Sequence, residues 1–246
     1  MGKISFNNFG YVAEKSKDYT ISASRFFYWK KFEKKIILDI VKKLSINEED
    51  KLLDVGCNVG NQLIPLSFIA KEVYGLDHVK CIKKLKLRFP EIPSRNLISG
   101  NFLNLKIKKK FTKVLSYSVL QYLENKKEVF KFSDKILQIL EKNGVAMLGD
   151  IPNKSMEKKF YSSRKGKVWL KNFHLLRSNS RKKTKFENIS SYLGNRKRDK
   201  FCVEINNELL SELVDRLKKK SRKVIRIKHG TEFALPSTRE DIIIYK

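Results

Sequence analysis

Neither a long apolar run nor a pair of closely spaced cysteines occurs in this sequence of 246 residues. No run approaches the roughly 18 uninterrupted apolar residues that a membrane helix needs, so we predict no membrane span. The three cysteines, Cys57, Cys81 and Cys202, form no Cys-x-x-Cys motif, so they predict neither a disulfide framework nor a zinc site. The first residues contain no apolar signal-peptide core, and we therefore expect a cytoplasmic protein.

Acidic residues are scarce relative to basic ones. The chain has 54 Lys and Arg against 26 Asp and Glu, a formal net charge of +28. Such a charge favours anionic partners, namely nucleic acid, anionic lipid headgroups, or phosphorylated and acidic substrates. Lysine spread over every solvated face would give the same total, so a specific site requires local clustering. With a hydrophobic fraction of 41%, the chain is long enough to form one folded domain with a sizeable core.

An apolar stretch that ends in an acid and a glycine-containing turn organises the chain. Residues 51–60 begin as a strand, pass through Asp54 and enter a turn that contains Gly56 and Gly60. A helix is expected to follow over residues 61–70. Glycine takes backbone angles closed to other residues and lets a ligand approach the main chain, so this turn is a candidate nucleotide-binding loop.

A second apolar stretch, residues 72–77, also ends in an acid, Asp77. Because the carboxyl ends of neighbouring parallel strands meet at one edge of a sheet, we expect Asp54 and Asp77 at a cofactor-binding edge. There a carboxylate accepts both hydroxyls of a ribose. Residues 56–61 lack two glycines of the Gly-x-Gly-x-x-Gly dinucleotide fingerprint, and Asp54 would repel a pyrophosphate. A dinucleotide is therefore disfavoured.

The turn resembles the first motif of the class I S-adenosylmethionine-dependent methyltransferases. Asp54, Gly56 and Gly60 match that motif. Asn58 stands in place of its middle glycine. The resemblance covers residues 45–150 and the C-terminus, and it implies a methyltransferase with S-adenosyl-L-methionine as cofactor. It also implies that the loop wraps the methionine part, whose ammonium suits a nearby acid, while the second acid holds the ribose.

The same resemblance implies further cofactor contacts. His78 would border the adenine or ribose. Asn101, in a Gly-Asn pair where the family usually carries Gly-Asp, would accept the adenine amino group, and Phe102 follows it. Ser116 and Ser118 belong to a Ser-x-Ser-x-Leu-x-Tyr-Leu run that resembles the segment bordering the transferring methyl group.

The remaining periodicities predict an α/β fold. Apolar steps of three and four indicate helices, and short alternating or continuous apolar runs indicate strands. Gly144 is expected to end one helix as its left-handed cap. The resemblance implies a Rossmann-like seven-stranded methyltransferase sheet, mostly parallel with its last strand antiparallel, and helices on both faces. The expected helices include residues 22–44, 81–89, 130–140 and 206–220, and the further strands are residues 96–98, 111–116, 145–150, 223–228 and 241–245.

We expect a single domain over residues 1–246 with a basic insert after the fifth strand. Residues 151–200 hold 16 Lys and Arg against 3 acids, interleaved with aromatic residues. We interpret this insert as a substrate cap, and a merely solvated segment is the alternative. The expected parts are an N-terminal helical lid over residues 1–44, a cofactor-binding core over 45–150, the basic cap over 151–205, and a C-terminal helix and strand pair over 206–246.

Methyl transfer from a sulfonium is an in-line displacement that depends mainly on placing the nucleophile, and it requires no metal. A hydroxyl acceptor needs a base within hydrogen-bond reach. Asp150, at a strand end, and His174, in the insert, are the candidate catalytic residues, with His229 as a further candidate. The basic residues that are candidates for holding an acceptor phosphate or carboxylate are Arg164, Lys165, Arg177 and Arg181.

Three functional interpretations remain. We prefer methyl transfer to a hydroxyl or amine of an anionic small molecule, such as a nucleotide-linked or phosphorylated sugar precursor of surface polysaccharide, because residues 118–123 resemble biosynthetic methyltransferases. The alternative is an RNA methyltransferase that holds nucleic acid with the basic insert. Against it, the turn lacks the Asn/Asp-Pro-Pro-Tyr/Phe motif of nucleic-acid amino methyltransferases. A scaffold with a decayed cofactor site is indicated only by Asn58 and Asn101.

Overall fold

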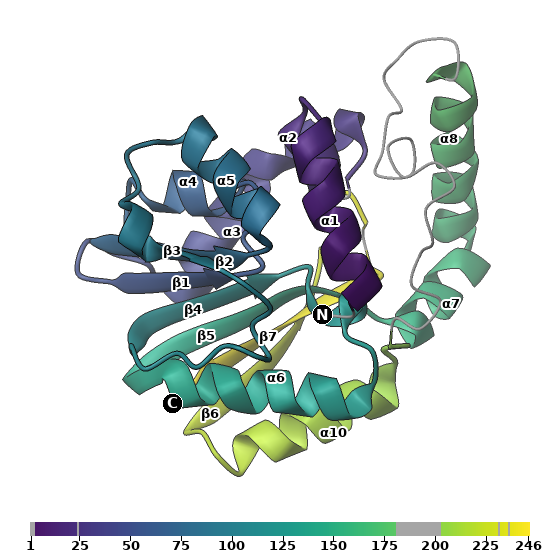
Figure 1. The fold of residues 1–246 in the computed structure, drawn as a ribbon. Helices are drawn as coiled ribbons and strands as arrows, with labels where there is room; N and C mark the ends of the chain where they lie inside the picture. Colours follow the sequence, from purple (N-terminus) through teal and green to yellow (C-terminus); the bar gives the residue numbers. More distant parts are fainter. Residues whose placement is uncertain (1–2, 24, 181–202, 231, 236) are drawn as a thin grey trace.

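One sheet of seven strands forms the centre of the protein (Figure 1). The computed structural model describes residues 3–23, 25–180, 203–230, 232–235 and 237–246. The strands are β1 (Lys51–Val55), β2 (Glu72–Asp77), β3 (Leu97–Ser99), β4 (Phe111–Tyr117), β5 (Leu140–Pro152), β6 (Lys223–Lys228) and β7 (Arg239–Tyr245). They lie in the order β3-β2-β1-β4-β5-β7-β6.

The strand directions confirm the predicted fold class. Strands β1 to β5 pair in parallel, and β7 runs antiparallel to both of its neighbours. This is the Rossmann-like methyltransferase sheet, mostly parallel with its last strand antiparallel. Strands β1, β2 and β4 are covered on both faces, which is why they read as nearly continuous apolar runs.

Helices cover the two faces of the sheet and create two cores. On one face, α6 and α10 pack on Leu53 and its neighbours, and on the other, α3, α4 and α5 pack on Leu52 and its neighbours (Figure 1). Successive residues of β1 thus serve opposite faces. No helix within the described ranges is both long and apolar enough to cross a membrane. The helices are α1 (Lys3–Lys15), α2 (Tyr19–Ser22), α3 (Glu33–Leu44), α4 (Leu63–Leu66), α5 (Val79–Arg88), α6 (Lys126–Ile139), α7 (Lys154–Ser162), α8 (Arg164–Ser180) and α10 (Asn207–Lys218), with 3₁₀ turns η1 (Phe27–Phe32), η2 (Ser94–Asn96) and η3 (Leu120–Tyr122).

The helix predicted over residues 61–70 is wrong in length, because only the four residues of α4 are α-helical. Pro65 has no N–H to bond the carbonyl of Asn61. At the other end, the N–H of Phe68 bonds three residues back, to the carbonyl of Pro65 at 3.4 Å. Both ends therefore leave α geometry within about one turn.

The helix predicted over residues 22–44 is also wrong, since α3 begins only at Glu33 after the 3₁₀ turn η1. Ahead of these elements the chain turns Arg25 inward. The N–H of Arg25 donates to the carbonyl of Thr20 at 3.1 Å, and its guanidinium pairs with Glu33 at 2.8 Å. A continuous helix would separate Arg25 and Glu33 by about 12 Å along its axis. The buried ion pair therefore requires the break.

Gly144 does not form the predicted left-handed cap. Helix α6 ends at Ile139, and β5 begins at once with Leu140. The residue with positive φ is Asn143, at +65°, a conformation that Asn tolerates better than most residues. Its N–H donates to the carbonyl of Lys246 at 3.2 Å, so the turn fastens the C-terminus to the sheet.

Helices α7 and α8 form the described part of the insert after β5. The predicted basic clusters at residues 181–185 and 196–198 lie outside the described residues, as does Cys202. Elsewhere the predicted helices and strands agree with the structure to within about two residues at each end, apart from the longer helix α6 and strand β5.

Candidate active site

Asp54 and Asp77 lie at the carboxyl ends of two neighbouring strands, β1 and β2. The pairing sets Asp54 opposite Gly75, so the two acids are offset by two residues along adjacent strands. Both are buried, with 2% and 4% of their surface exposed. The structure therefore brings the two acids together at one edge of the sheet, as the sequence indicated.

The turn after β1 has left-handed backbone conformation at three positions. The φ angle is +86° at Gly56, +50° at Asn58 and +88° at Gly60. Asn adopts this region more readily than most other residues, which explains how Asn58 replaces the middle glycine of the motif. A Cβ on Gly56 would lie 2.5 Å from Cγ2 of Val119, so this position also needs glycine for space.

The main chain of the turn holds Asp77. Its Oδ2 accepts a hydrogen bond from the N–H of Asn58 at 2.7 Å, and its Oδ1 accepts one from the N–H of His78 at 2.5 Å. Burial raises the pKa of Asp77, while these two hydrogen bonds oppose the shift. Because each carboxylate oxygen has about two acceptor sites, Asp77 retains capacity to accept the two hydroxyls of a ribose.

Asp54 lacks such support. Its Oδ2 is buried and has no hydrogen-bond partner among the described residues. Burial, with a further contribution from the charge of Asp77, raises the pKa of Asp54 to about 8. Close by in the chain, the buried Nε2 of Gln62 also has no partner in the described part of the structure.

These orphaned atoms fit the predicted cofactor. An unsatisfied buried donor or acceptor costs about 1–3 kcal/mol, so one of each at the same turn indicates a site completed by a ligand. The carboxylate oxygen of Asp54 suits an ammonium, and the amide N–H of Gln62 suits a carboxylate. Those are the two groups at the methionine end of S-adenosylmethionine.

Two adjoining cavities open at this edge, and Gly56, Asp77 and Val119 line both of them. The polar residues that line the first cavity include Arg25 and Ser118. The second is small and mostly apolar. Its other lining residues are Phe6, Val55, Leu76, Gly100, Asn101, Phe102 and Phe132.

Helix α1 covers both cavities. Phe9 lines the first and packs edge-on against Tyr122, with ring centroids 4.9 Å apart. Phe6 lines the second. Helices α1 and α2 (purple in Figure 1) stand against this edge of the sheet, between α5 and the α7–α8 pair.

The segment around α2 is also hydrogen-bonded to the turn. Nδ2 of Asn58 donates to the carbonyl of Ser22 at 3.0 Å, and Nδ2 of Asn61 donates to the carbonyl of Tyr19 at 3.0 Å. The residue that replaces the middle glycine therefore connects the cofactor turn to the N-terminal segment.

The other predicted cofactor residues fall into two groups. Asn101 and Phe102 line the second cavity. Four others, Asp54, Gly60, His78 and Ser116, line neither cavity. His78 caps α5, where its Nδ1 accepts from the N–H of Lys80 at 3.1 Å. Ser116 is fully buried in β4, and its Oγ has no partner among the described residues.

Ser118 and Asp150 form a pair where β4 and β5 end. Oγ of Ser118 donates to Oδ2 of Asp150 at 2.7 Å, and Nε2 of Gln121 donates to Oγ of Ser118 at 3.0 Å. Both members have positive φ, +63° and +54°. Such angles are costly for residues other than glycine and cluster at functional sites. Ser118 lines the first cavity, where an acceptor would lie, whereas Asp150 lines neither cavity and lies behind Ser118, one hydrogen bond away.

A buried ionic network supports Asp150 from β7. Oδ2 of Asp241 accepts from Nζ of Lys43 at 2.5 Å. Its Oδ1 accepts from the N–H of Asp150 at 2.8 Å and lies 2.8 Å from Nε2 of His229. Burial would raise the pKa of Asp241, but His229 and Lys43 outweigh it and lower the pKa. Burial would lower the pKa of His229, but Asp241 outweighs it and raises the pKa. His229 thus contacts Asp241, and it lines neither cavity.

Arg25 brings a cation into the first cavity. Its Nη1 donates to both oxygens of Glu33, at 2.8 and 3.0 Å, and its guanidinium lies 5.7 Å from the ring centroid of Tyr117. Burial opposes the charge of Arg25, but Glu33, Tyr117 and Asp150 outweigh it and raise the pKa. Within the described residues, Arg25 is the one cation that lines this cavity.

Aromatic residues connect the cap to the segment beside Arg25. Trp169 stacks on Phe173 with centroids 5.2 Å apart and planes at 11°, and Phe173 meets Phe26 edge-on at 5.7 Å. His174 is exposed and lines neither cavity. Arg164 and Lys165 are exposed at the start of α8. The side chain of Arg177 and the whole of Arg181 lie outside what the structure describes.

Three contributors to the site were missing from the sequence prediction: Arg25, Gln62 and Asp241. Gln62 follows the glycine turn directly, and that position was the available signal. Arg25 lay in a segment interpreted as one helix, and Asp241 is 91 residues from Asp150, so neither had a local signal. No group of three or more His, Cys, Asp or Glu side chains in the described ranges could hold a metal ion.

Comparison with known proteins agrees with this geometry. Residues 53–148 match the family model described as a methyltransferase domain. A search of curated proteins found no match. Together with the fold and the glycine turn, the family match defines a nucleoside-cofactor enzyme of the methyltransferase type. The chain has the fold of the class I S-adenosylmethionine-dependent methyltransferases and matches a methyltransferase domain over residues 53–148, which supports S-adenosylmethionine as its cofactor.

Solved structures share the fold at low sequence identity. Phosphoethanolamine N-methyltransferase 1 of Haemonchus contortus, solved with phosphoethanolamine and S-adenosylhomocysteine, has a TM-score of 0.66 and 15% identity over 98% of this chain and 48% of that one. This chain thus spans about half the length of the Haemonchus enzyme. N-methyltransferase NodS of Bradyrhizobium japonicum WM9 has a TM-score of 0.57 and 10% identity, covering 98% and 97%. A methyltransferase of Clostridium acetobutylicum ATCC 824 has a TM-score of 0.55 and 16% identity, also covering 98% and 97%.

Proposed function

We propose that this methyltransferase acts on a hydroxyl or amine of an anionic small molecule, such as a nucleotide-linked or phosphorylated sugar precursor of surface polysaccharide. The observation that carries the proposal is the buried guanidinium of Arg25, which lines the same cavity as Ser118. Glu33 engages Nη1 and leaves the other N–H groups of Arg25 for a ligand. A fixed guanidinium of this kind binds phosphate or carboxylate.

The Haemonchus neighbour is compatible with such an acceptor, because it was solved with phosphoethanolamine, a phosphorylated amine. Its fold therefore accommodates a small acceptor that has a phosphate and a nucleophile close together. We expect an acceptor of this design here, with the anionic group at Arg25 and the nucleophile beside Ser118.

Different residues would bind the cofactor, accept the proton and exclude water. Asp54, Asp77 and Gln62 would hold S-adenosylmethionine, which supplies an electrophilic methyl group on a sulfonium. Asp150 accepts the proton of an acceptor hydroxyl, and the hydrogen bond from Ser118 fixes its carboxylate. Helix α1 excludes water from the same space.

His174 is the second candidate base. Its exposed place on α8 would require the cap to approach the first cavity. We therefore assign the base role to Asp150 and propose that His174 contributes less.

An RNA acceptor held by the basic insert is the second candidate function. The stacked pair Trp169 and Phe173 favours it, because aromatic rings among lysines bind single-stranded bases. In that case the acceptor would lie along the cap, and Arg25 would hold a backbone phosphate.

The decisive experiment is an acceptor screen with radiolabelled S-adenosylmethionine, comparing phosphorylated and nucleotide-linked sugars with total RNA. Incorporation into a small anionic acceptor supports the proposal, and incorporation into RNA alone overturns it in favour of the alternative. With an acceptor in hand, Arg25→Gln should raise its KM about 10- to 100-fold, as loss of a charged hydrogen bond does, and leave the cofactor Kd unchanged. The exposed Arg222→Gln is the matched control. A raised cofactor Kd in Arg25→Gln would instead assign Arg25 to the cofactor.

A further inference from the structure

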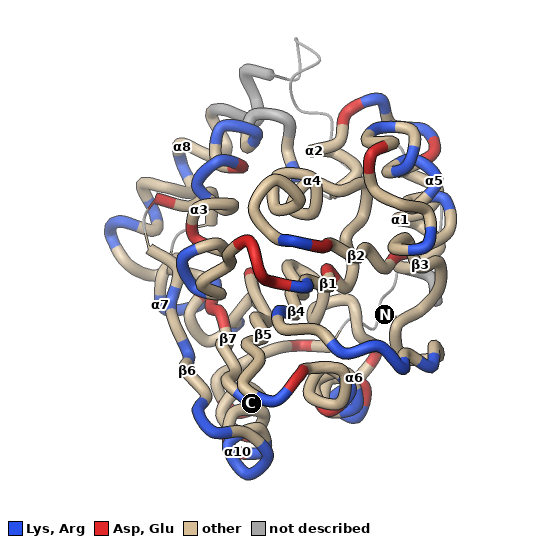
Figure 2. Tube along the Cα trace, turned by 90° about the vertical axis from the view of Figure 1, so that its left-hand side faces the viewer, with Lys and Arg blue, Asp and Glu red and all other residues tan. Residues whose placement is uncertain are grey.

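A basic groove of about 960 Å³ lies outside the catalytic cleft, between residues 103–110, α6 and one residue of α10. Seven of its lining residues are Lys or Arg, and one is acidic. The acid, Asp134, is already paired with Arg216 and with Lys220, the latter at 2.8 Å. Figure 2 shows basic residues on α10, around α6 and along the chain that leads into β4.

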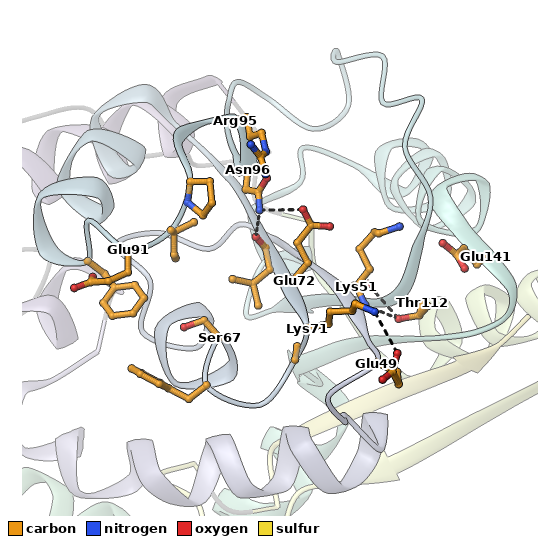
Figure 3. Close-up of a pocket in the computed structure, with 16 residues that line it drawn as sticks. Glu49, Lys51, Ser67, Lys71, Glu72, Glu91, Arg95, Asn96, Thr112 and Glu141 are labelled. Atoms are coloured by element: carbon orange, nitrogen blue, oxygen red, sulfur yellow. Dashed lines mark hydrogen bonds and ion pairs between the residues drawn. The ribbon is translucent and has the colours of Figure 1, made fainter.

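A second groove of nearly the same size shows that this charge is local. That groove, of about 930 Å³, lies at the opposite end of β1 and β2 from the cofactor turn (Figure 3). It is lined by four acids and three basic residues, and Lys71 pairs there with Glu49 at 3.3 Å. Lysine spread evenly over the surface would make both grooves basic. The difference between them therefore indicates a specific cluster in the basic groove.

The two walls of the basic groove present cations at regular steps. On α6, Lys127, Lys131 and Lys135 recur every four residues, which is about 6 Å along a helix. On the facing wall, Lys106 and Lys108 alternate with partly buried apolar residues, which is about 6–7 Å in an extended chain. Regular spacing on two facing walls suits a linear polymer with one charge in each repeat.

Two of the lysines fix the walls to each other. Nζ of Lys135 donates to the carbonyls of Phe102 and Leu105, and Nζ of Lys110 donates to the carbonyl of Gln138. The groove is therefore held together without a ligand. The four that remain, all exposed and without an ion-pair partner among the described residues, are Lys106, Lys108, Lys127 and Lys131.

The floor of the groove is apolar and includes one aromatic ring. Leu105, Ile107 and Phe130 are half-buried against the core and line the groove. The guanidinium of Arg216 already lies 5.5 Å from the ring centroid of Phe130. A polymer with planar, partly apolar groups between its phosphates could stack one of these groups on the ring of Phe130.

We propose that this groove binds a single strand of RNA, with its phosphates on the lysine walls and its bases against Phe130. A second copy of the chain is disfavoured, because its net charge is also +28. A lipid surface would not enter a groove whose cations face each other from two walls. The site is separate from the cleft at Arg25, so the proposal does not depend on which acceptor is methylated.

The test is fluorescence anisotropy of the full chain with labelled single-stranded RNA of about 12 nucleotides, at several salt concentrations. The groove variant is Lys106→Glu, Lys108→Glu, Lys131→Glu. The matched control has the same charge change at exposed lysines of α3 and α5, Lys34→Glu, Lys35→Glu, Lys83→Glu. Unchanged thermal unfolding establishes that both variants are folded.

We expect the groove variant to bind RNA at least about 30-fold more weakly with a shallower salt dependence, and the control to change less than about 3-fold. Phe130→Leu should weaken RNA binding about 5-fold and leave polyphosphate binding unchanged. Equal losses in both charge-reversal variants would overturn the proposal. So would polyphosphate competing as well as RNA at equal phosphate, or preferential binding of phosphatidylglycerol vesicles.

Discussion

The functional edge of the sheet carries two pairs of acids, one after β1 and β2 and the other on β5 and β7. In the first pair, Asp54 has an oxygen without a partner among the described residues, and its pKa is raised to about 8. In the second pair, Asp241 contacts Lys43, His229 and the N–H of Asp150, and its pKa is lowered. Asp54 and Asp241 are both almost fully buried, but only Asp241 has partners for both of its oxygens among the described residues.

We propose that this difference separates a ligand-binding acid from a structural one. A fully partnered carboxylate stabilises the fold and holds its neighbours in place, whereas a buried carboxylate without partners destabilises the ligand-free protein. In this proposal, a ligand with a positive charge removes that cost at Asp54. Asp77, held by two N–H groups but with free acceptor capacity, lies between these extremes.

Removal of Asp241 should have the largest effect. Asp241→Ala leaves Lys43, His229 and the N–H of Asp150 without their buried partner, and we expect a loss of about 3–5 kcal/mol in the free energy of unfolding. Urea titration measures it. Asp39→Ala removes the other, half-buried partner of Lys43 and should cost less than about 1 kcal/mol. Equal losses in the two variants would remove the distinction between the pairs.

The same network predicts a pH window for stability. The lowered pKa of Asp241 gives stability that is lost as pH falls through that pKa, and the raised pKa of His229 gives stability that is lost as pH rises through it. The pair therefore contributes its full stabilisation between about pH 4 and pH 6.5, the ordinary pKa values of Asp and His. In Asp241→Asn, both slopes should disappear.

Asp77→Ala should weaken cofactor binding about 100-fold, because two charged hydrogen bonds to ribose hydroxyls are worth about 3 kcal/mol together. Isothermal titration with S-adenosylmethionine measures this loss. Asp134→Ala, an acid outside the site, should bind as the parent does. An unchanged Kd in Asp77→Ala would rule out the ribose assignment.

Asp150→Asn should lower kcat about 100-fold, the usual contribution of a general base, while the cofactor Kd stays the same. The asparagine keeps an oxygen for the hydroxyl of Ser118, so the geometry of the turn survives. His174→Ala should lower kcat less. A larger loss of kcat in His174→Ala than in Asp150→Asn would assign the base role to His174.

Asp54→Asn should change the slope of stability with pH. Because the pKa of Asp54 is about 8 in the folded protein and about 4 when unfolded, the folded state binds one more proton between these values. Stability of the ligand-free protein therefore falls as pH rises, by about 1.4 kcal/mol per pH unit from this group. The variant should lose this pH dependence of stability. Saturating cofactor should also remove it in the parent protein. A ligand-free parent protein without this pH dependence would contradict the raised pKa of Asp54.

The sequence was sufficient for the sheet and for the acids at its edge. Strand signals are local, and once β1 and β2 pair in parallel, the positions of Asp54 and Asp77 at their ends determine that the acids meet. Asn58 was also readable, since its φ of +50° is a conformation that Asn shares with glycine.

Contacts between residues far apart in the chain could not be predicted from the sequence. The inward turn of Arg25 depends on its ion pair with Glu33, and helical periodicity gave no sign of it. Asp241 joins His229, Lys43 and Asp150 only because β7 inserts between β5 and β6. The cap contacts made by Phe173 likewise follow from tertiary packing. Residue type and spacing therefore located the glycine turn and its two acids better than the contacts around Arg25 and Asp241.

The amide of Asn58 donates to Ser22 while its N–H is bound by Asp77. One residue thus couples Asp77 to the N-terminal segment beside the cavities. We propose that donor entry and product exit both require withdrawal of that segment, which would break a bond of the same residue that orients Asp77. The exchange of spent for fresh donor is consequently tied to the opening rate of the N-terminal segment, and a looser segment would speed turnover of the cofactor at the expense of its retention.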